Sequence, residues 1–260
     1  MPETRVTIGG LGLAIAADRD DVVALARARF AGFLTDGPVS WRLIVTLGTV
    51  PDDRPALVVE RNGRPDRVRI AWSGLRGIVD LGRRRGDVVL AAADGLALEN
   101  FVRLACSLAL LKEGALLLHA SAVVRRGRGL VFSGPSGAGK TTVARLAGDG
   151  VVLGDELVVV GRDGRVHGTP FWGELSGAPQ PAPVPLGGLY FLRQGDRHAV
   201  APLSAREGLA ALFANVLFRA REPVLVAELM DVAAAIAAAV PAYTLTFRRD
   251  AGFWELVDGQ

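Results

Sequence analysis

The sequence predicts an α/β fold in two parts, a smaller β-rich region over residues 1–93 and a core over 94–260. Short apolar or alternating runs, typical of strands, dominate the first part. Halfway along the chain, a glycine-rich segment lies between an apolar run and a helical pattern. The runs that follow lack regular βαβ alternation, so the core is expected to be a mixed sheet and not a uniformly parallel one.

In the first part, one helix is expected before a series of strands. Residues 20–33 carry apolar side chains at helical spacing. The arginine cluster at 83–85 predicts a solvated turn between strands. Expected strands lie at 41–45, 56–59, 68–72 and 88–90, with turns at 51–53 and 62–63.

The second part is expected to open with a long helix over 94–112 that ends at Gly114. Strands are expected before and into the glycine-rich segment, and residues 162–164 predict a hairpin turn. Residues 169–174 fit either a loop over a bound acceptor or a connection anchored by its aromatic side chains. Expected later elements are a proline-rich connection at 178–185, helices at 203–220 and 224–239, and a strand at 243–247.

The glycine-rich segment matches the pattern G-x-x-x-x-G-K-[ST] at every fixed position. Glycines allow consecutive backbone N–H groups to point inward and cradle a phosphate. In this pattern the lysine reaches the β- and γ-phosphates, and the Thr hydroxyl binds Mg²⁺. The residues expected to bind the nucleotide are Gly134, Pro135, Ser136, Gly137, Ala138, Gly139, Lys140 and Thr141, with Thr142 opening the next helix.

Two features of the composition bear on the nucleotide. The chain has only two lysines, Lys112 and Lys140, so the phosphate motif holds one of them. The Asn-Lys-x-Asp sequence with which GTPases read guanine is missing, which favours ATP.

An apolar run ends in two adjacent carboxylates, Asp155 and Glu156. A strand that follows the loop's helix is expected to pair near the loop's own strand and to bring these acids beside the bound phosphates. One carboxylate can hold Mg²⁺ and the other can accept a proton from an attacking hydroxyl. Thr141 and Asp155 are therefore the candidate metal ligands, although the sequence does not separate the roles of the two acids.

His119 lies in an apolar run, where a histidine is typically a hydrogen-bonded core residue. However, Leu118-His119-Ala120-Ser121, the glycine-rich segment and Gly154-Asp155-Glu156 together resemble the catalytic core of HPr kinase/phosphorylase. They are especially similar to short HPr-kinase-related bacterial proteins, some of which occur in lasso-peptide clusters. The resemblance covers about residues 112–260.

The resemblance implies a mixed, largely antiparallel core of the phosphoenolpyruvate carboxykinase/HPr kinase type, with ATP and Mg²⁺ as ligands. It makes Lys140 the phosphate-binding lysine, Thr141 a metal ligand, and Asp155 and Glu156 the acidic pair, and it places His119 close to the transferred phosphoryl group. The family has Asp-Asp where this chain has Asp155-Glu156, and its Glu-x-Arg-Gly-Leu-Gly segment is missing. These differences disfavour HPr itself as the acceptor and disfavour the reverse phosphorolysis.

Composition narrows the class of protein further. The net charge is +3 with scattered arginines, so no nucleic-acid partner is expected. Cys106 is the only cysteine, which excludes a disulfide within the chain and fits a reducing compartment. No signal peptide or membrane-length apolar run is found, so a cytoplasmic protein without a membrane partner is expected, with its oligomeric state open to a homo-oligomer.

These observations predict an ATP- and Mg²⁺-dependent kinase that transfers the γ-phosphoryl group to a hydroxyl, with a serine of a peptide or small protein as acceptor. Three alternatives share the same residues. They are a small-metabolite kinase acting on an acceptor such as free serine, a simple ATPase, and a nucleotide-binding regulatory module without turnover. Residues 248 and 249, two arginines after the last expected strand, could meet a phosphate, although terminal arginines typically face water.

Overall fold

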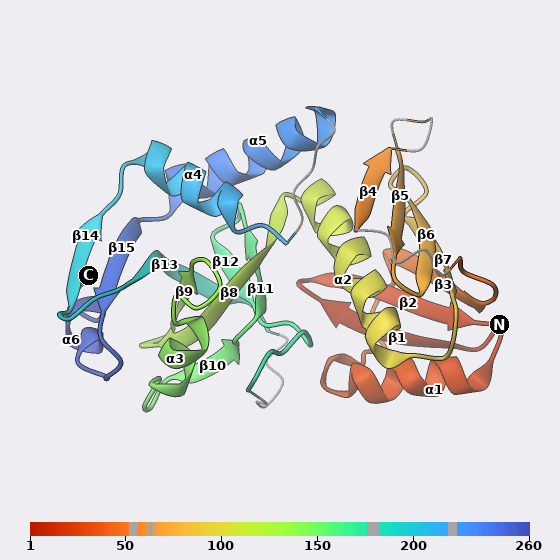
Figure 1. The fold of residues 1–260 in the computed structure, drawn as a ribbon, viewed down its shortest axis with the longest axis horizontal. Helices are drawn as coiled ribbons and strands as arrows, with labels where there is room; N and C mark the ends of the chain where they lie inside the picture. Colours follow the sequence, from red (N-terminus) through yellow and green to blue (C-terminus); the bar gives the residue numbers. More distant parts are fainter. Residues whose placement is uncertain (52–56, 62–63, 65, 176–181, 218–222) are drawn as a thin grey trace. The chain divides into compact units, whose positions relative to one another are not determined.

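A computed structural model describes residues 1–260 except 52–56, 62–63, 65, 176–181 and 218–222. The described residues form two compact units, each built on a mixed sheet (Figure 1). The first comprises Met1–Glu113 with the start of helix α5 (Pro223–Ala239) up to Val226, and the second comprises Gly114–Leu217 with Ala227–Gln260. The predicted α/β class is confirmed.

The first unit has a seven-stranded sheet in the order β1-β2-β3-β7-β6-β5-β4. Strands β2, β3 and β7 are mutually parallel, and the other neighbours are antiparallel. The elements are β1 (Glu3–Ile8), β2 (Leu11–Ala17), α1 (Asp20–Arg29), the 3₁₀ turn η1 (Ala31–Phe33), β3 (Trp41–Leu47), β4 (Val58–Arg61), β5 (Arg67–Trp72), β6 (Leu75–Asp80), β7 (Arg85–Leu90) and α2 (Gly95–Lys112).

Helix α2 groups with the first unit, so this unit extends beyond the boundary at residue 93 expected from the sequence. The cause is close packing on the sheet. Phe101 of α2 lies over two strand glycines, and a Cβ atom added at Gly77 would come within 2.7 Å of the Phe101 ring. The helix itself is as predicted, because the Asp94 side chain accepts a hydrogen bond from Leu96 N–H at its start and Gly114, at φ 77°, follows its end.

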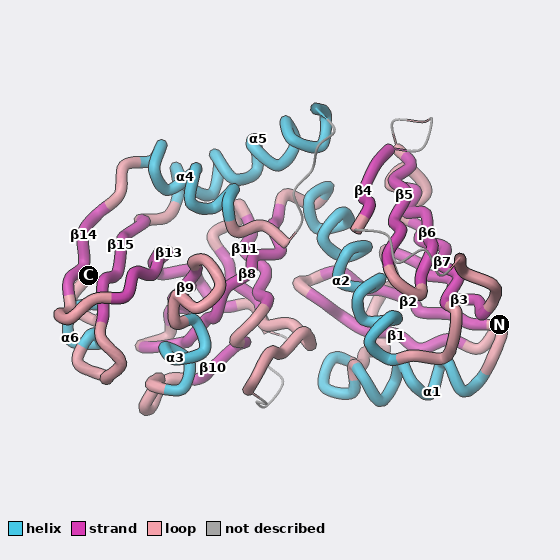
Figure 2. The backbone as a smooth tube through the Cα atoms, in the orientation of Figure 1, coloured by secondary structure: helices cyan, strands magenta, loops and turns pink. Residues whose placement is uncertain are grey.

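The second unit has an eight-stranded sheet in the order β10-β8-β11-β12-β13-β15-β14, with β9 paired to both β8 and β13. Figure 2 distinguishes its strands, helices and loops. The elements are β8 (Ala115–Arg125), β9 (Arg128–Ser133), α3 (Lys140–Arg145), β10 (Val151–Gly154), β11 (Leu157–Gly161), β12 (Arg165–His167), β13 (Val184–Gln194), β14 (Ala199–Pro202), α4 (Ala205–Ala214), α5 (Pro223–Ala239), β15 (Ala242–Phe247) and α6 (Phe253–Val257).

Strand β9 has neighbours of opposite direction. It runs antiparallel to β8 and parallel to β13, and β13 is also parallel to β15. Stacked aromatic rings hold these strands and α6 together: the Phe132 ring stacks on Tyr190 at 5.2 Å and meets Trp254 edge-on at 5.5 Å. The carboxyl ends of β9, β13 and β15 therefore meet at one edge of the sheet.

Some expected elements end earlier than predicted. The helix expected over 20–33 stops at Arg29, and a 3₁₀ turn follows. The helix expected over 203–220 covers Ala205–Ala214, begins with a Ser204–Glu207 capping box, and gives way to a strand-like bridge between Val216 and Leu118.

The turns expected at 83–85 and 162–164 join β6 to β7 and β11 to β12, and Arg84 has a φ of 52°. Residues 52–53, 62–63 and 178–181 of the other expected turns, and Ala56 of one expected strand, lie outside the described residues.

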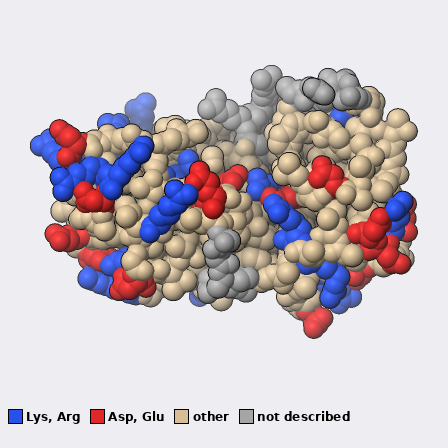
Figure 3. All heavy atoms as spheres, turned by 60° about the horizontal axis from the view of Figure 1, so that its bottom comes forward, with Lys and Arg blue, Asp and Glu red and all other residues tan. Residues whose placement is uncertain are grey.

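Charged side chains of both signs are interspersed on the face drawn in Figure 3. In the part of the chain that the structure describes, no helix combines the length and apolarity that a membrane crossing requires.

Candidate functional site

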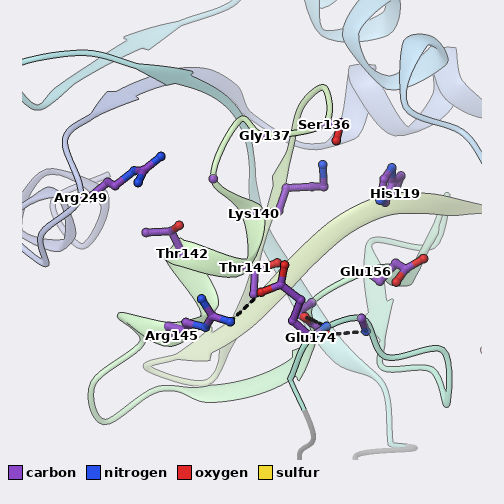
Figure 4. Close-up of a pocket in the computed structure, with 13 residues that line it drawn as sticks. His119, Ser136, Gly137, Lys140, Thr141, Thr142, Arg145, Glu156, Glu174 and Arg249 are labelled. Atoms are coloured by element: carbon purple, nitrogen blue, oxygen red, sulfur yellow. Dashed lines mark hydrogen bonds and ion pairs between the residues drawn. The ribbon is translucent and has the colours of Figure 1, made fainter.

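A cavity of about 440 Å³ lies in the second unit, where the loop after β9 meets the ends of neighbouring strands (Figure 4). It contains all four predicted catalytic residues. Gly134, Pro135 and Ala138 of the predicted set do not line it. Its walls are His119, Ser136, Gly137, Gly139, Lys140, Thr141, Thr142, Arg145, Asp155, Glu156, Gly173, Glu174 and Arg249.

Strand pairing brings these residues together. Ala120 of β8 pairs with Ser133, the last residue of β9, so His119 lies beside the start of the loop. His119 in turn pairs with Leu157 of β11, the residue directly after the acidic pair. The sheet register thus places the histidine, the loop and the two acids at one edge.

The glycine-rich loop, residues 134–141, connects β9 to α3 through backbone conformations that favour glycine. Gly137 has a φ of 78° and Gly139 a φ of 109°, both in the left-handed region. At Gly139 there is also no room for a side chain, because a Cβ atom would come within 2.6 Å of the Phe247 ring. The glycines at 137 and 139 are therefore required by the conformation of the loop itself.

Lys140 is buried at the first position of α3, and its ammonium group is held by the loop. Its Nζ donates hydrogen bonds to the carbonyl oxygens of Gly134 at 2.9 Å and Pro135 at 3.2 Å. Burial lowers the pKa of Lys140 below its usual range, and the negative charge of Glu156 partly opposes this shift. Gly134 and Pro135 thus contribute to the site through their carbonyl groups, although they do not line the cavity.

Asp155 is 2% exposed, and its carboxylate holds the backbone of the segment after β12. Its Oδ1 accepts a hydrogen bond from Gly173 N–H at 2.9 Å, and its Oδ2 accepts from Glu174 N–H at 2.9 Å and Leu175 N–H at 3.1 Å. A carboxylate has about four acceptor positions, so three of them are used and one on Oδ1 remains. Asp155 is first an anchor for this segment.

Glu156 is half-buried and, like Asp155, lies against Gly173. A Cβ atom added at Gly173 would be 3.0 Å from Glu156 Oε2 and 3.1 Å from Asp155 Oδ2, so the absence of a side chain there lets both carboxylates approach this backbone. Of the two acids, Glu156 has the carboxylate whose charge acts on the Lys140 ammonium. Figure 4 shows Glu156 and His119 on the same side of Lys140.

His119 is exposed to the cavity, so its interpretation as a buried core histidine is wrong. Its backbone N–H donates to the carbonyl of Asn215 at 2.8 Å, which fixes its position in β8. An imidazole placed this way can donate to, or accept from, a group in the cavity.

The segment 169–174 is anchored at one end and lines the cavity at the other. Phe171 is fully buried, and Thr169 Oγ1 donates to the carbonyl of Leu157 at 2.6 Å. Gly173 and Glu174 lie in the cavity wall, and Glu174 forms an ion pair with Arg145 of α3 at 2.6 Å. The structure therefore bears out the anchor at Phe171, and the end of the segment borders the cavity, where the alternative of a loop over the acceptor stays a prediction.

Two arginines in the cavity wall were not predicted as site residues from the sequence. Arg145 follows the phosphate motif on the same helix, and Arg249 follows β15, whose parallel pairing with β13 brings its carboxyl end to the loop. The two consecutive arginines at 248–249 can be seen in the sequence. However, no local signal indicates which strand the final strand, β15, pairs with, so the sequence does not place these arginines at the loop.

The donor set suits a metal bound mainly through phosphates. Among the described residues, no three His, Cys, Asp or Glu side chains form a cluster that could hold a metal ion. Mg²⁺ typically takes one or two carboxylates together with substrate phosphates and water. The Thr141 hydroxyl, the remaining acceptor position of Asp155 and the Glu156 carboxylate fit that requirement.

The comparison with known families gives one match. The family model described as SynChlorMet cassette protein ScmC matches residues 98–259, which is more than half of the chain and includes every residue that lines the cavity. No curated protein matches the chain.

Proposed function

We propose that this chain, which belongs to the family of the SynChlorMet cassette protein ScmC, is an ATP- and Mg²⁺-dependent kinase. It transfers the γ-phosphoryl group to a hydroxyl, with a serine of a peptide or small protein as the acceptor. The observation that carries the proposal is the convergence of Lys140, Glu156 and His119 on one cavity beside the glycine-rich loop. The core is then a P-loop core of the HPr kinase and phosphoenolpyruvate carboxykinase type.

The loop would bind the β- and γ-phosphates through its backbone N–H groups, as its two left-handed glycines favour. Lys140 now bonds to two loop carbonyls, and a triphosphate would draw its ammonium toward the stronger, charge-assisted acceptors. Thr141 and Thr142, both in the cavity wall, offer hydroxyl groups to the phosphates or to a metal ion. The bound Mg²⁺ would neutralise charge on the β- and γ-phosphates.

The transfer step requires one proton acceptor. The acceptor's hydroxyl oxygen attacks the γ-phosphorus, the bond to the β–γ bridging oxygen breaks, and ADP leaves with that electron pair. Glu156 takes the hydroxyl proton, because its carboxylate lines the cavity and its charge acts on the Lys140 ammonium, whereas the Asp155 carboxylate accepts three backbone N–H groups. His119 orients the acceptor or the γ-phosphate from the same side.

Asp155 supports this chemistry mainly as a positioning residue. Its three backbone hydrogen bonds keep Gly173 and Glu174 in the cavity wall and keep Glu156, the next residue, in place. The sequence alone left the roles of the two acids open, and these hydrogen bonds support the proposed division, with Glu156 as base and Asp155 as positioning residue.

The test is label transfer from γ-³²P-ATP to a serine-containing peptide or to proteins of a cell lysate. Lys140→Ala should abolish transfer, and Lys112→Ala is the matched control, because Lys112 is the only other lysine and lies on α2 of the first unit. Undiminished transfer by Lys140→Ala would contradict the proposal. Transfer of label to free serine and not to the peptide would identify a small-metabolite kinase. Label that appears only in inorganic phosphate would identify an ATPase, and ATP binding without turnover would identify a regulatory module.

A further inference from the structure

A second, smaller cavity lies at the carboxyl ends of the parallel strands. Its volume is about 200 Å³, and its walls include Gln194 and Gly195 after β13 and Phe247, Arg248 and Arg249 at the end of β15. In open α/β sheets, ligands bind beyond the carboxyl ends of parallel strands. The pairing of Gln194 with Phe247 shows that both strands end at the same level.

The two cavities are neighbours along the glycine-rich loop. Both are lined by Gly137, Gly139, Thr142 and Arg249. A complete ligand pocket typically has about 300–1,000 Å³. The smaller cavity is below that range, so it fits one part of a ligand whose remainder lies in the larger cavity.

The smaller cavity offers apolar surface and cations and has no acidic side chain in its wall. The Phe247 ring is only 2% exposed and packs against the backbone of Gly139, so it forms an apolar floor under the loop, whereas the side chains of Arg248 and Arg249 are exposed. Gln194 Nε2 donates to the carbonyl of Gly137 at 2.6 Å, which ties the end of β13 to the loop. A small cavity with an apolar floor and cations beside it suits a nucleoside joined to phosphates.

We propose that the smaller cavity receives the nucleoside end of the nucleotide, while Arg249 binds the phosphates that pass from it into the larger cavity. The inference deepens the proposed function and rests on it. It sets the direction of the triphosphate, from Thr142 toward Lys140, so that the acceptor hydroxyl approaches from the side of Ser136, His119 and Glu156. Figure 4 shows Thr142 and Arg249 on the opposite side of Lys140 from His119 and Glu156.

The turn that carries the two arginines is held in place. Asp250 Oδ1 lies 2.8 Å from His198 Nε2 and accepts the Gly252 N–H at 2.9 Å, and its Oδ2 is paired with Arg248. Arg249 therefore projects from an ordered turn, which reduces the cost of fixing its side chain on a phosphate.

The experiment compares the affinity of the full chain for Mg-ATP with that for inorganic tripolyphosphate, which lacks the nucleoside. The wild-type chain should bind ATP at least about tenfold more tightly, the effect of one or two added contacts. Arg248→Ala should weaken ATP about tenfold and tripolyphosphate less, because Arg248 lines only the smaller cavity, whereas Arg249→Ala should weaken both about equally. Arg193→Ala is the matched control, because Arg193 is an exposed arginine of β13 outside both cavities.

A second measurement does not depend on any substitution. Photolabelling with 8-azido-ATP should modify peptides that contain Gln194 or Phe247, as read by mass spectrometry. Labelling confined to other peptides, or unchanged ATP affinity in Arg248→Ala, would overturn the inference while leaving a kinase in place. Failure of the wild-type chain to bind either ATP or tripolyphosphate would overturn the proposed function and this inference with it.

Discussion

Asparagine at position 155 should destabilise the protein, although it has nearly the same size and shape as aspartate. The Asp155 carboxylate is buried and accepts three backbone N–H groups, from Gly173, Glu174 and Leu175. An asparagine side chain has one acceptor oxygen, and its NH₂ group is a donor. In either orientation the NH₂ group faces at least one backbone N–H, so that donor loses its partner.

The magnitude follows from this lost bond. A hydrogen bond to a charged group contributes about 1.5–3 kcal/mol, and a buried donor left without a partner costs a similar amount. We therefore expect Asp155→Asn to lower the free energy of unfolding by about 2–3 kcal/mol. At about 2–4 °C per kcal/mol for a protein of this size, Tm should fall by about 4–12 °C.

Thermal unfolding and phosphoryl transfer, measured side by side, provide the assay. Glu156→Gln is the companion variant, because it changes the neighbouring acid in the same isosteric way without touching the three N–H groups. We expect Glu156→Gln to keep the wild-type Tm and to lose transfer, whereas Asp155→Asn should lose both stability and transfer. ATP affinity should persist in Glu156→Gln.

The opposite pattern would refute this reasoning. An Asp155→Asn protein with unchanged Tm and abolished transfer would mean that the carboxylate acts in the chemistry and that its backbone bonds contribute little. Full transfer by Glu156→Gln would remove Glu156 as the proton acceptor and leave Asp155 and His119 as candidates.

Three further predictions concern the loop and the turn beside it. Gly139→Ala would put a side chain on a left-handed residue and within 2.6 Å of the Phe247 ring, so it should weaken ATP binding more than tenfold. Gly127→Ala is the control, because Gly127 is also left-handed, at a φ of 74°, but has open space around it. This control should cost only about 1–2 kcal/mol of stability. Burial lowers the pKa of Lys140, and the ammonium form of its side chain binds phosphate, so ATP affinity should fall as the pH rises through that lowered pKa. Binding titrations from neutral to alkaline pH should show this fall in the wild type. Lys140→Arg should give a flat profile, because arginine stays charged over this range. The Gly252 N–H, His198 and Arg248 lower the pKa of Asp250 to about 2, so its contribution to stability should be present above about pH 4 and be lost as the pH falls toward 2. Tm measured against pH should therefore separate Asp250→Asn from the wild type at pH 5 and bring the two together near pH 2.

Local patterns predicted those elements whose cause is local. The strand–loop–helix around Lys140, the long helix after Asp94 and the turn at Arg84 depend on spacing, caps and left-handed positions that can be read in the sequence. The unit boundary could not be predicted in this way. It depends on Phe101 packing over glycines of two strands, and no local signal assigns a helix to one sheet or another.

The same distinction applies to the site. The phosphate motif and the acidic pair were recognisable because their residues are adjacent in sequence. The proposed division of roles between Asp155 and Glu156 rests on three backbone N–H groups of the segment after β12, which no local pattern connects to the acidic pair. Arg249 depends on β15 joining the sheet parallel to β13, which is a long-range pairing that propensity does not encode.

The opposite directions of the two neighbours of β9 explain why the cavities differ in character. The antiparallel neighbour β8 brings His119, and through β11 the acidic pair, to one side of the loop. The parallel neighbour β13, with β15 beside it, brings Gln194 and Arg249 to the other side. Among the described residues, the walls of the larger cavity therefore hold His119 and the acidic pair, whereas those of the smaller cavity hold cations and no acidic side chain. If the proposed kinase bound a nucleotide along the loop in the reverse direction, the nucleoside would lie beside Glu156 and the γ-phosphate would lie away from Glu156 and His119, so the sheet topology supports the proposed direction of transfer, toward β8.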